Sequence, residues 1–499
     1  MKEGRKMVFK NYIGGKWVHS KSGATFESIN PANGEVIGVV SKSDATDVDD
    51  AVEAAARAFP SWRKVPAPRR AEILFRAAQI MLSRKEELSL LVTREMGKVI
   101  KEGRGDVQEG IDMTFYTAGE GRRLLGSTTP AELPNKFAMS VRDPIGVVAA
   151  ITPWNFPIAI PTWKLMPALV AGNTVVFKPA SDTPVLAHKL VEILEEAGIP
   201  GGVLNLVLGP GGTVGDALVS HPKVDLISFT GSTAAGKGVA QKASEQLKRV
   251  SLEMGGKNAI IVMDDADLEL AVDGIIWSAY GTTGQRCTAA SRLIVHEAVL
   301  KELADRLINR IGALRLGDGL LDTTDVGPVV NASQLDKIHG YVEAGIKEGA
   351  NLLIGGTICD EGDCAKGFFH KPTLFDNVNP NMRIAQEEIF GPVVSMIAVS
   401  SLDQAIEVNN ASRYGLSSSI FTRDINNAFR AMRDITTGIV YVNAGTIGAE
   451  VHLPFGGTRG TGNGHREAGQ AALDIFTEWK SLYVDFSGRL QRAQIDLDS

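Results

Sequence analysis

One cysteine of this chain, Cys287, stands where a thiol can do covalent chemistry. It lies in T-T-G-Q-R-C-T (282–288), a segment of small and polar residues that leaves the sulfur within reach of a small molecule. The thiolate is the nucleophilic form of cysteine, and we expect the positive charge of Arg286 beside it to favour that form. Because cysteine is also among the residue types most often buried, this segment alone allows a structural role as well.

Two further residues have the types that a nucleophilic thiol needs as partners. Glu253 lies in L-E-M-G-G-K-N (252–258), where apolar neighbours disfavour its charge and raise its pKa toward the range of a general base. Asn155 lies in P-W-N-F-P (153–157), between prolines and aromatic residues that hold its amide rigidly, as an oxyanion-hole donor requires. An ordinary turn asparagine would also explain Asn155.

Two glycine-rich segments resemble phosphate-binding motifs without completing them. G-S-T-A-A-G-K (231–237) is followed by Gly238, where a P-loop needs a hydroxyl, and G-P-G-G-T-V-G (209–215) spaces its last glycine one residue too far for a dinucleotide fingerprint. Both follow predicted strands, where glycines allow the backbone to approach a phosphate. Glycines that only turn the chain are the alternative.

Short buried strands alternate with helices, and the residues above lie at the strand ends. Strands are predicted at 147–151, 174–177, 203–208 and 226–229, and amphipathic helices at 48–59, 69–82 and 86–97. Continuous β-branched runs between helices are typical of a parallel sheet buried on both faces, which predicts a doubly wound α/β domain. Ligands of such sheets bind beyond the carboxyl ends of the strands.

The composition favours a globular protein with a small-molecule substrate. The 52 basic and 58 acidic residues are interspersed, and no basic stripe indicates a nucleic acid partner. No apolar run can span a bilayer and no apolar stretch follows the charged N-terminus, so we expect a cytoplasmic protein that does not bind membranes. The three cysteines do not form a disulfide framework, and Cys359 and Cys364 have no matching Cys/His pair, so no metal site is expected.

The chemically suggestive segments together resemble the aldehyde dehydrogenase superfamily, in the family's order and over essentially the whole chain. The matching segments are P-W-N-F-P (153–157), F-K-P-A-S (177–181), F-T-G-S-T-A-A-G (229–236), L-E-M-G-G-K (252–257), G-Q-R-C (284–287), E-E-I-F-G-P (387–392) and P-F-G-G (454–457). The resemblance implies that Cys287 attacks an aldehyde, that Asn155 and the Cys287 N–H hold the oxyanion, and that Glu253 activates water to hydrolyse a thioester.

The resemblance also implies NAD or NADP as the cofactor and a set of residues that bind it. Thr152 and Trp154 match positions that line the cofactor site with backbone and side chain. On the adenosine side, Lys178 matches the residue that binds the ribose, Gly211 and Gly215 match residues beside the adenine, and Gly231 and Ser232 match residues that face the pyrophosphate. On the nicotinamide side, Glu388 matches the residue that binds the ribose and Phe390 the residue that packs beside the ring, and Phe229 and Thr230 belong to the same site. Ser181 stands where NAD-selective members have a glutamate, which predicts good use of NADP. Gln470 stands where many relatives place a second carboxylate, so a second proton relay is in doubt.

A chain of 499 residues exceeds what one hydrophobic core supports, and a second α/β series begins near Asn258. We expect a dinucleotide-binding domain (1–125 and 145–255), an α/β catalytic domain (256–455) and a small β oligomerisation flap (126–144 and 470–499). The strand-like segments 126–144 and 481–486 lie outside both series and need partners, either each other or a second subunit. The family resemblance implies pairing across subunits, in a homodimer or homotetramer.

Three functions remain open at this level. The first is a hydrolytic aldehyde dehydrogenase; the second is a CoA-acylating relative, which has no need of Glu253; the third is a non-catalytic structural protein on the same fold. The sequence is most similar to the bacterial members that oxidise 2,5-dioxopentanoate, in segments 160–164, 283–292 and 465–472. Trp163 differs from the arginine of some carboxylate-binding members, so succinate semialdehyde, glyceraldehyde phosphate and aliphatic aldehydes stay open as substrates.

Overall fold

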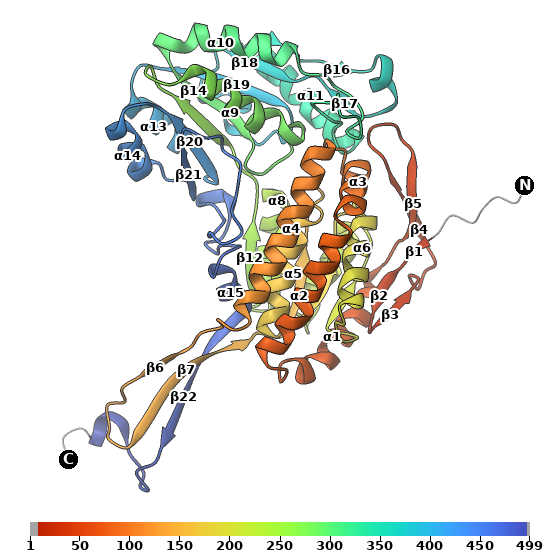
Figure 1. The fold of residues 1–499 in the computed structure, drawn as a ribbon, viewed down its shortest axis with the longest axis vertical. Coiled ribbons are helices and arrows are strands. Elements are labelled where there is room, and N and C mark those ends of the chain that lie inside the picture. The colour runs from red at the N-terminus through yellow and green to blue at the C-terminus, as the bar shows by residue number, and fades with distance from the viewer. Residues whose placement is uncertain (1–7, 497–499) are drawn as a thin grey trace, which may run out of the picture.

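The computed structural model describes residues 8–496 and contains two large sheets, one above the other, with a narrow arm of strands at one end (Figure 1). The outer ends of the predicted segments 1–125 and 470–499 lie outside the described residues. Between residues 8 and 496, no helix combines the length and the apolar character needed to cross a bilayer.

The first large sheet has the strand order β12-β11-β8-β9-β10-β2-β3, and its first five strands are parallel. Its strands are β2 (Asn11–Ile13), β3 (Lys16–Val18), β8 (Val147–Ile151), β9 (Thr174–Lys178), β10 (Leu204–Leu206), β11 (Leu226–Thr230) and β12 (Arg249–Glu253). Because side chains alternate along a strand, Val148 of β8 faces one core and Ala149 the other. We call this the cofactor sheet.

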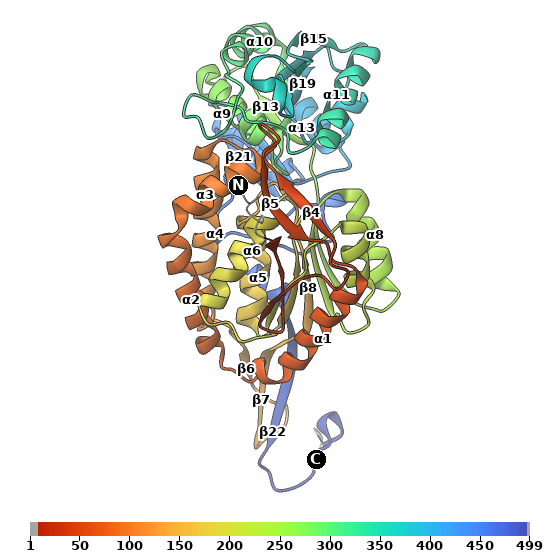
Figure 2. The same ribbon diagram turned by 90° about the vertical axis from the view of Figure 1, so that its right-hand side faces the viewer.

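Helices cover both faces of the cofactor sheet, which confirms the predicted doubly wound arrangement. The helices are α1 (Ala45–Trp62), α7 (Asp216–Ser220) and α8 (Thr233–Ser244) on one face, and α2 (Ala67–Ser83), α3 (Lys85–Met96), α4 (Ile100–Glu120), α5 (Ala159–Ala171) and α6 (Pro184–Glu196) on the other. Figure 2 shows α1 and α8 on one side of β8, and α2 and α4 on the opposite side.

The second large sheet, the catalytic sheet, has the order β15-β18-β19-β14-β13-β20-β21, with only β15 antiparallel to its neighbour. Its strands are β13 (Asn258–Val262), β14 (Ala290–His296), β15 (Asn351–Ile354), β18 (Thr373–Asp376), β19 (Val393–Val399), β20 (Ser417–Phe421) and β21 (Ile439–Val442). The helices α9 (Leu268–Tyr280) and α10 (Glu297–Gly312) pack on one face, and α11 (Ala332–Lys347), α12 (Arg383–Gln386), α13 (Leu402–Asn410) and α14 (Ile425–Asp434) on the other.

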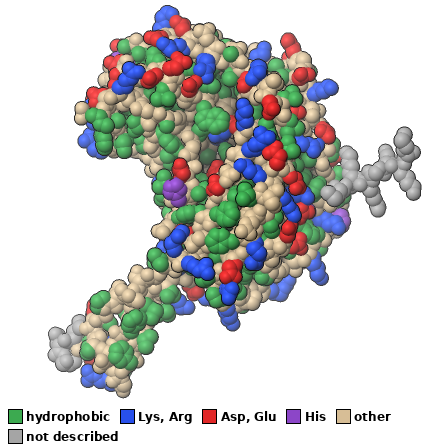
Figure 3. Space-filling view, in the orientation of Figure 1, with side chains coloured by type: hydrophobic (Ala, Val, Ile, Leu, Met, Phe, Trp, Pro, Cys, Tyr) green, Lys and Arg blue, Asp and Glu red, His purple; other side chains and the backbone are tan. Residues whose placement is uncertain are grey.

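The arm is a three-stranded antiparallel sheet, the flap, that extends from the rest of the molecule (Figures 1 and 3). It consists of β6 (Ser127–Thr129), β7 (Lys136–Pro144) and β22 (Thr477–Asp485), with Thr477 opposite Pro144 and Asp485 opposite Lys136. The two strand-like segments therefore pair with each other in one chain. The domain boundaries at residues 255 and 455 stay a prediction.

Smaller elements complete the fold. They are β1 (Val8–Phe9), β4 (Thr25–Ile29), β5 (Val36–Ser41), β16 (Ile358–Cys359), β17 (Phe369–His370) and α15 (Ala471–Phe476), with the single turns η1 (Gly211–Gly215), η2 (Gly281–Gly284), η3 (Gly362–Lys366), η4 (Arg459–Thr461) and η5 (Ala493–Asp496). Of these, η2 is the turn that precedes Cys287 in the chain and positions it.

Candidate active site

A strained turn presents Cys287. In η2, Thr282 and Thr283 adopt left-handed backbone angles, with φ of 51° and 58°, which β-branched residues rarely adopt. The carboxylate of Glu102 in α4 accepts hydrogen bonds from the Thr282 N–H at 2.8 and 2.9 Å. Strain of this kind persists only where surrounding contacts hold it, and it is typical of functional sites.

Two more contacts hold the turn in place. The side-chain amide of Asn258, the first residue of β13, donates to the carbonyl oxygens of Cys287 at 2.7 Å and Ala289 at 2.9 Å. At Gly284 φ is +67°, and a Cβ there would lie 2.3 Å from the carbonyl oxygen of Gly391, so only glycine fits. The nucleophile is thus positioned by the catalytic sheet and by helix α4, which packs on the cofactor sheet.

Cys287 lies at the junction of two cavities. The larger, of about 360 Å³, opens at the carboxyl ends of the cofactor-sheet strands and is also lined by Asn155. The smaller, of about 140 Å³, is walled by Phe156, Trp163 and Phe455 and also lined by Glu253. A molecule in either cavity can therefore reach the sulfur.

The expected effect of Arg286 on Cys287 is wrong. Burial and, to a smaller extent, the carboxylates of Glu253 and Glu388 together raise the pKa of the Cys287 thiol to about 12. The guanidinium of Arg286 turns to α4, where its Nη2 lies 2.9 Å from Glu102, and its Nε donates to the Thr282 hydroxyl at 2.8 Å. The charge of Arg286 is thus neutralised by another carboxylate, and the thiol needs a base.

Glu253, the last residue of β12, is a suitable base. Only 3% of it is exposed, and neither carboxylate oxygen has a hydrogen-bond partner among the described residues. Burial, and then the charge of Glu467, raise the pKa of Glu253 well above its usual value. A Cβ at Gly456 would lie 2.8 Å from Glu253 Oε1, so the glycine in P-F-G-G leaves room for the carboxylate.

A buried ion pair beside Glu253 was not among the predicted site residues. Lys164 of α5 is fully buried, pairs with Glu467 and donates to the Ser228 hydroxyl at 3.2 Å. The carboxylate near Glu253 is therefore Glu467, whereas Gln470 is exposed at the start of α15. A lysine inside the apolar sequence of α5 was the available signal, because a buried charge needs a partner.

Asn155 lies in the loop that joins β8 to α5. It is 2% exposed, its Oδ1 has no hydrogen-bond partner among the described residues, and it lines the larger cavity together with Cys287. The structure therefore brings all three predicted catalytic residues to one place, Asn155 in the larger cavity and Glu253 in the smaller, with Cys287 between them.

The larger cavity contains most of the residues predicted to bind the cofactor. Its lining includes Thr152, Trp154, Lys178, Gly211, Phe229, Thr230, Gly231, Ser232, Glu388 and Phe390. Ser181 and Gly215 are not part of this lining, although Ser181 Oγ donates to the Gly209 carbonyl at 3.1 Å in the adjoining loop. Gln334 and Lys337 of α11 also line the cavity and were not predicted.

The chemistry of this lining fits a dinucleotide. Helix α8 begins at the cavity, with Ser232 as its N-cap, and a helix N-terminus favours a pyrophosphate. Among the described residues, the hydroxyls of Thr152 and Thr230 have no hydrogen-bond partner, and a Cβ on Gly211 would meet no atom within 4 Å. Burial lowers the pKa of Lys178 to about 8, so a bound anion would stabilise its charge.

The far wall of the cavity is held by hydrogen bonds from the catalytic sheet. Glu388 accepts from the Gly256 N–H at 3.1 Å, and the Phe390 ring lies edge-on to Trp154 at 5.4 Å between centroids. Gln334 Nε2 donates to the carbonyl oxygens of Ile389 and Phe390 at 3.1 and 2.9 Å. These bonds hold Phe390 in its left-handed conformation, with φ of 60°.

Comparison with known proteins decides the family. Residues 17–482 match the model described as the aldehyde dehydrogenase family. The chain belongs to the aldehyde dehydrogenase family. It is therefore an oxidoreductase that acts on aldehydes, as the resemblance of its motifs implied.

Relatives align with this aldehyde dehydrogenase over nearly their full length. The alpha-ketoglutaric semialdehyde dehydrogenase of Bacillus subtilis is 44% identical over 96% of this chain and 98% of its own. The 2,5-dioxopentanoate dehydrogenase of Saccharolobus solfataricus is 40% identical over 95% and 99%. A betaine aldehyde dehydrogenase of Staphylococcus aureus, solved with NAD+, has a TM-score of 0.94 at 36% identity over 96% of each chain. Such NAD+-bound neighbours are consistent with use of NAD or NADP in this family.

Proposed function

We propose that this aldehyde dehydrogenase oxidises its substrate to a carboxylate through a thioester on Cys287. The observation that carries the proposal is the position of Cys287 between a cavity suited to a dinucleotide and a smaller cavity that holds an unpartnered Glu253. A nucleophile, a base and an oxyanion donor within one cleft are what acyl transfer requires.

The first step joins the aldehyde to the enzyme. Glu253 removes the thiol proton, and the Cys287 sulfur adds to the aldehyde carbon, which gives an oxyanion. The Asn155 amide and the Cys287 N–H hold that oxyanion by hydrogen bonds that strengthen as charge develops. Bound among the residues that line the larger cavity, NAD or NADP would supply the acceptor for a hydride from the former aldehyde carbon, and loss of that hydride leaves a thioester on Cys287.

The second step releases the product. After Glu253 has passed the thiol proton to solvent, it removes a proton from water, the resulting hydroxide adds to the thioester carbon, and the sulfur leaves as the carboxylate forms. The negative charge of Glu467 keeps the pKa of Glu253 high and so makes it a stronger base. A CoA-acylating enzyme would not need this buried base, and a non-catalytic protein would need neither Glu253 nor an accessible Cys287.

The test is a panel of aldehydes assayed with NAD or NADP, with and without CoA. We expect reduced cofactor and free carboxylate in equal amounts without CoA, and no turnover by a Cys287→Ala variant that still binds the cofactor. Acyl-CoA as the product would favour the second function. An alanine variant with a tenth of the wild-type activity would exclude the covalent route.

We further propose that the substrate carries a remote 2-oxo carboxylate, as 2,5-dioxopentanoate does. Support comes from the names of two relatives, an alpha-ketoglutaric semialdehyde dehydrogenase and a 2,5-dioxopentanoate dehydrogenase. Other relatives act, by name, on betaine aldehyde and phenylacetaldehyde, so the panel includes cationic and aromatic aldehydes.

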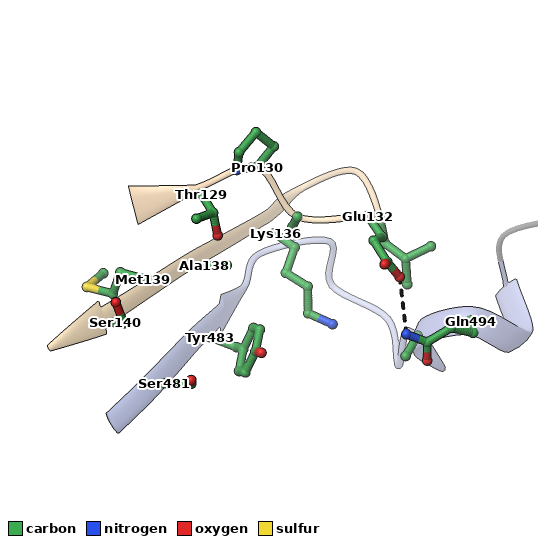
Figure 4. Close-up of a pocket in the computed structure, with 13 residues that line it drawn as sticks. Thr129, Pro130, Glu132, Lys136, Ala138, Met139, Ser140, Ser481, Tyr483 and Gln494 are labelled. Atoms are coloured by element: carbon green, nitrogen blue, oxygen red, sulfur yellow. Dashed lines mark hydrogen bonds between the residues drawn. The ribbon is translucent and has the colours of Figure 1, made fainter. Parts of the chain in front are cut away.

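The flap supports the proposal of a homo-oligomer, a dimer or a tetramer. Several large apolar side chains of the flap and the chain after it are more than 40% exposed: Phe137, Trp479, Tyr483, Val484, Phe486 and Leu490. A cavity of about 500 Å³ lies between the flap strands and the turn η5, where Gln494 donates to Glu132 at 3.2 Å (Figure 4). Exposed apolar patches and an open strand edge are what a second subunit covers.

A reducing compartment, the cytoplasm, is the location we propose. Cys287, Cys359 and Cys364 are all free thiols in the structure. Catalysis through Cys287 needs the reduced sulfur, and disulfides persist chiefly in oxidising compartments.

A further inference from the structure

One face of α4 holds three carboxylates and meets two cations. Glu102, Asp106 and Glu109 are spaced four and three residues apart, so they lie along the same side of the helix. Asp106 pairs with Lys98 at 3.1 Å, and Glu102 pairs with Arg286 at 2.9 Å. Each of the two cations, Lys98 and Arg286, therefore already forms an ion pair with a carboxylate of α4.

Glu109 is the carboxyl group left over. It makes no ion pair within residues 8–496, and it lines the small cavity beside Cys287. The group faces Asp106 and Asp112 on its own helix, Lys98 and Arg286 across from it, and Glu253 and Glu467 in the cavity wall. Burial and the charge of Asp106 raise its pKa to about 8, so near neutral pH it is mainly the acid and can donate a hydrogen bond.

Arg286 is the single cation among the described residues that line the small cavity. Its Nε and Nη2 bind Thr282 and Glu102, and its guanidinium carbon lies 4.9 Å from the Trp277 ring centre and 5.4 Å from that of Phe156. Its Nη1 has no hydrogen-bond partner in the described part of the chain. The Arg286 side chain is thus held in a fixed position, and its Nη1 can still donate a hydrogen bond to a ligand.

The 2-oxo carboxylate of a substrate such as 2,5-dioxopentanoate offers only hydrogen-bond acceptors. The protonated carboxyl group of Glu109 and the guanidinium of Arg286 are both hydrogen-bond donors, so together they match a 2-oxo carboxylate. A substrate with an ammonium group would instead need an ionised Glu109 as its acceptor. An ionised Glu109 would also repel a substrate carboxylate at short range. The rings of Trp163, Phe156 and Phe455 line the same cavity and offer an apolar surface to the carbon chain of the substrate.

We propose that Glu109 and Arg286 bind the remote 2-oxo carboxylate of the substrate and so determine which aldehyde is oxidised. This rests on the proposed oxidation at Cys287 and adds the residues that select the substrate. Both residues line the small cavity and act on the choice of substrate, and neither takes part in the bond changes at the sulfur.

The test compares 2,5-dioxopentanoate with pentanal, a neutral aldehyde of the same chain length, and with 5-aminopentanal. The measured quantity is the ratio of kcat/KM for the oxo acid to kcat/KM for pentanal. We expect Glu109→Ala to lower this ratio about 10- to 100-fold, the range for loss of a hydrogen bond to a charged group. Glu109→Gln keeps a donor and rescues the ratio to within about threefold, while Glu87→Ala, at an exposed position of the neighbouring helix α3, serves as the control.

The pH dependence gives an independent readout. Since the raised pKa of Glu109 is about 8, its acid form is present below that pH and lost above it. In the wild type the ratio therefore falls as the pH rises through about 8, and in Glu109→Gln it does not. Taking a ratio cancels the titration of Cys287 and Glu253, which both substrates share.

Several results would overturn the inference. One is a wild-type ratio in both Glu109→Ala and Glu109→Gln. Another is 5-aminopentanal as the best substrate of the wild type, with its oxidation lost in Glu109→Gln. Oxidation of pentanal without oxidation of the oxo acid would refute both this inference and the substrate class, while oxidation at Cys287 stands. Failure to oxidise any aldehyde would refute the proposed function, and this inference with it.

Discussion

At the scale of single residues, the charges around Cys287 differ from those that its sequence neighbours suggest. Arg286 is adjacent in the chain but pairs with Glu102, which is 184 residues away. Glu253 and Asn155 were predictable because both stand in short segments whose other residues are apolar or rigid. Lys164 and Glu467 were not, because only folding brings a helix of one sheet to the strand-end loop of the other.

Glu253→Gln should slow the release of product more than formation of the thioester, although Glu253 acts in both steps. The Cys287 thiol is a much stronger acid than water and can also lose its proton to solvent in the larger cavity, whereas the attacking water depends on the carboxylate. The amide cannot remove a proton from water, and loss of a general base costs about 10²- to 10⁴-fold. Rapid mixing should show one equivalent of reduced cofactor per Cys287, followed by a slow steady state. Glu245→Gln, an exposed site with the same change of charge, is the matched control. A normal steady-state rate in the first variant would remove Glu253 from the mechanism.

Wild-type enzyme should use NADP well, at least as efficiently as NAD. Ser181, three residues after Lys178, is uncharged, whereas a carboxylate at this position would repel a 2′-phosphate. At 4 Å and an effective dielectric of roughly 20, that repulsion is about 4 kcal/mol. We therefore expect Ser181→Glu to shift the ratio of kcat/KM for NADP over NAD toward NAD by more than about tenfold. Ser244→Glu adds the same charge at the exposed end of α8. A strong wild-type preference for NAD, or an unmoved ratio in Ser181→Glu, contradicts the argument.

At the scale of elements, segments with a regular hydrophobic period could be predicted from the sequence, whereas a helix that depends on close packing against its neighbours could not. The predicted strands 147–151 and 226–229 correspond to β8 and β11, because buried β-branched runs have few alternatives. Helix α4 was not predicted, since it contains several glycines that weaken the helical pattern. A Cβ at Gly103 would lie 2.9 Å from the Ser89 carbonyl, and one at Gly110 would lie 2.7 Å from Ile158. Those glycines permit neighbouring segments to approach α4 closely. This reason for their presence appears only in the tertiary structure, so the sequence pattern alone does not predict the helix.

The turn η2 should tolerate no Cβ at its last position. In Gly284→Ala the new atom would meet the Gly391 carbonyl oxygen at 2.3 Å, with φ at +67°. We expect a loss of roughly 3 kcal/mol or more in the free energy of unfolding, or a displaced Cys287 with lower kcat. Denaturant unfolding and steady-state kinetics measure the two effects. Gly340→Ala in α11, where a Cβ meets nothing within 4 Å, should instead be neutral or stabilising. Equal behaviour of the two variants would refute the role of the clash.

At the scale of the whole molecule, the flap is the part that a single chain leaves uncovered. Its two long strands were predictable as strands that belong to neither α/β series, and their mutual pairing follows from the register between Thr477 and Asp485. Which surface of a second copy would cover it is not encoded in the local sequence pattern, because that depends on the shape of a whole assembly.

Light scattering at micromolar concentration should therefore report a dimer or a tetramer. Tyr483, 68% exposed, lies on β22, and Tyr483→Asp would place a charge in an apolar contact, so we expect smaller assemblies. Leu247→Asp changes a residue that is 94% exposed in a loop and should leave the mass unchanged. A wild-type enzyme that is monomeric and fully active would contradict the proposal.

The contact of Glu467 with Lys164 has a consequence for the order in which activity arises during synthesis. Residues on a ribosome emerge from the N-terminus, so Lys164, Glu253 and Cys287 leave the ribosome well before Glu467 does. Until then Lys164 lacks the carboxylate with which it pairs, and Glu253 lacks the charge that raises its pKa. The same late segment supplies Gly462, which bridges to Glu253. In the nascent chain Cys287 is therefore present before the surroundings of Glu253 are complete. We expect the enzyme to become active only when the C-terminal segment with Gly462 and Glu467 has folded against the cofactor sheet.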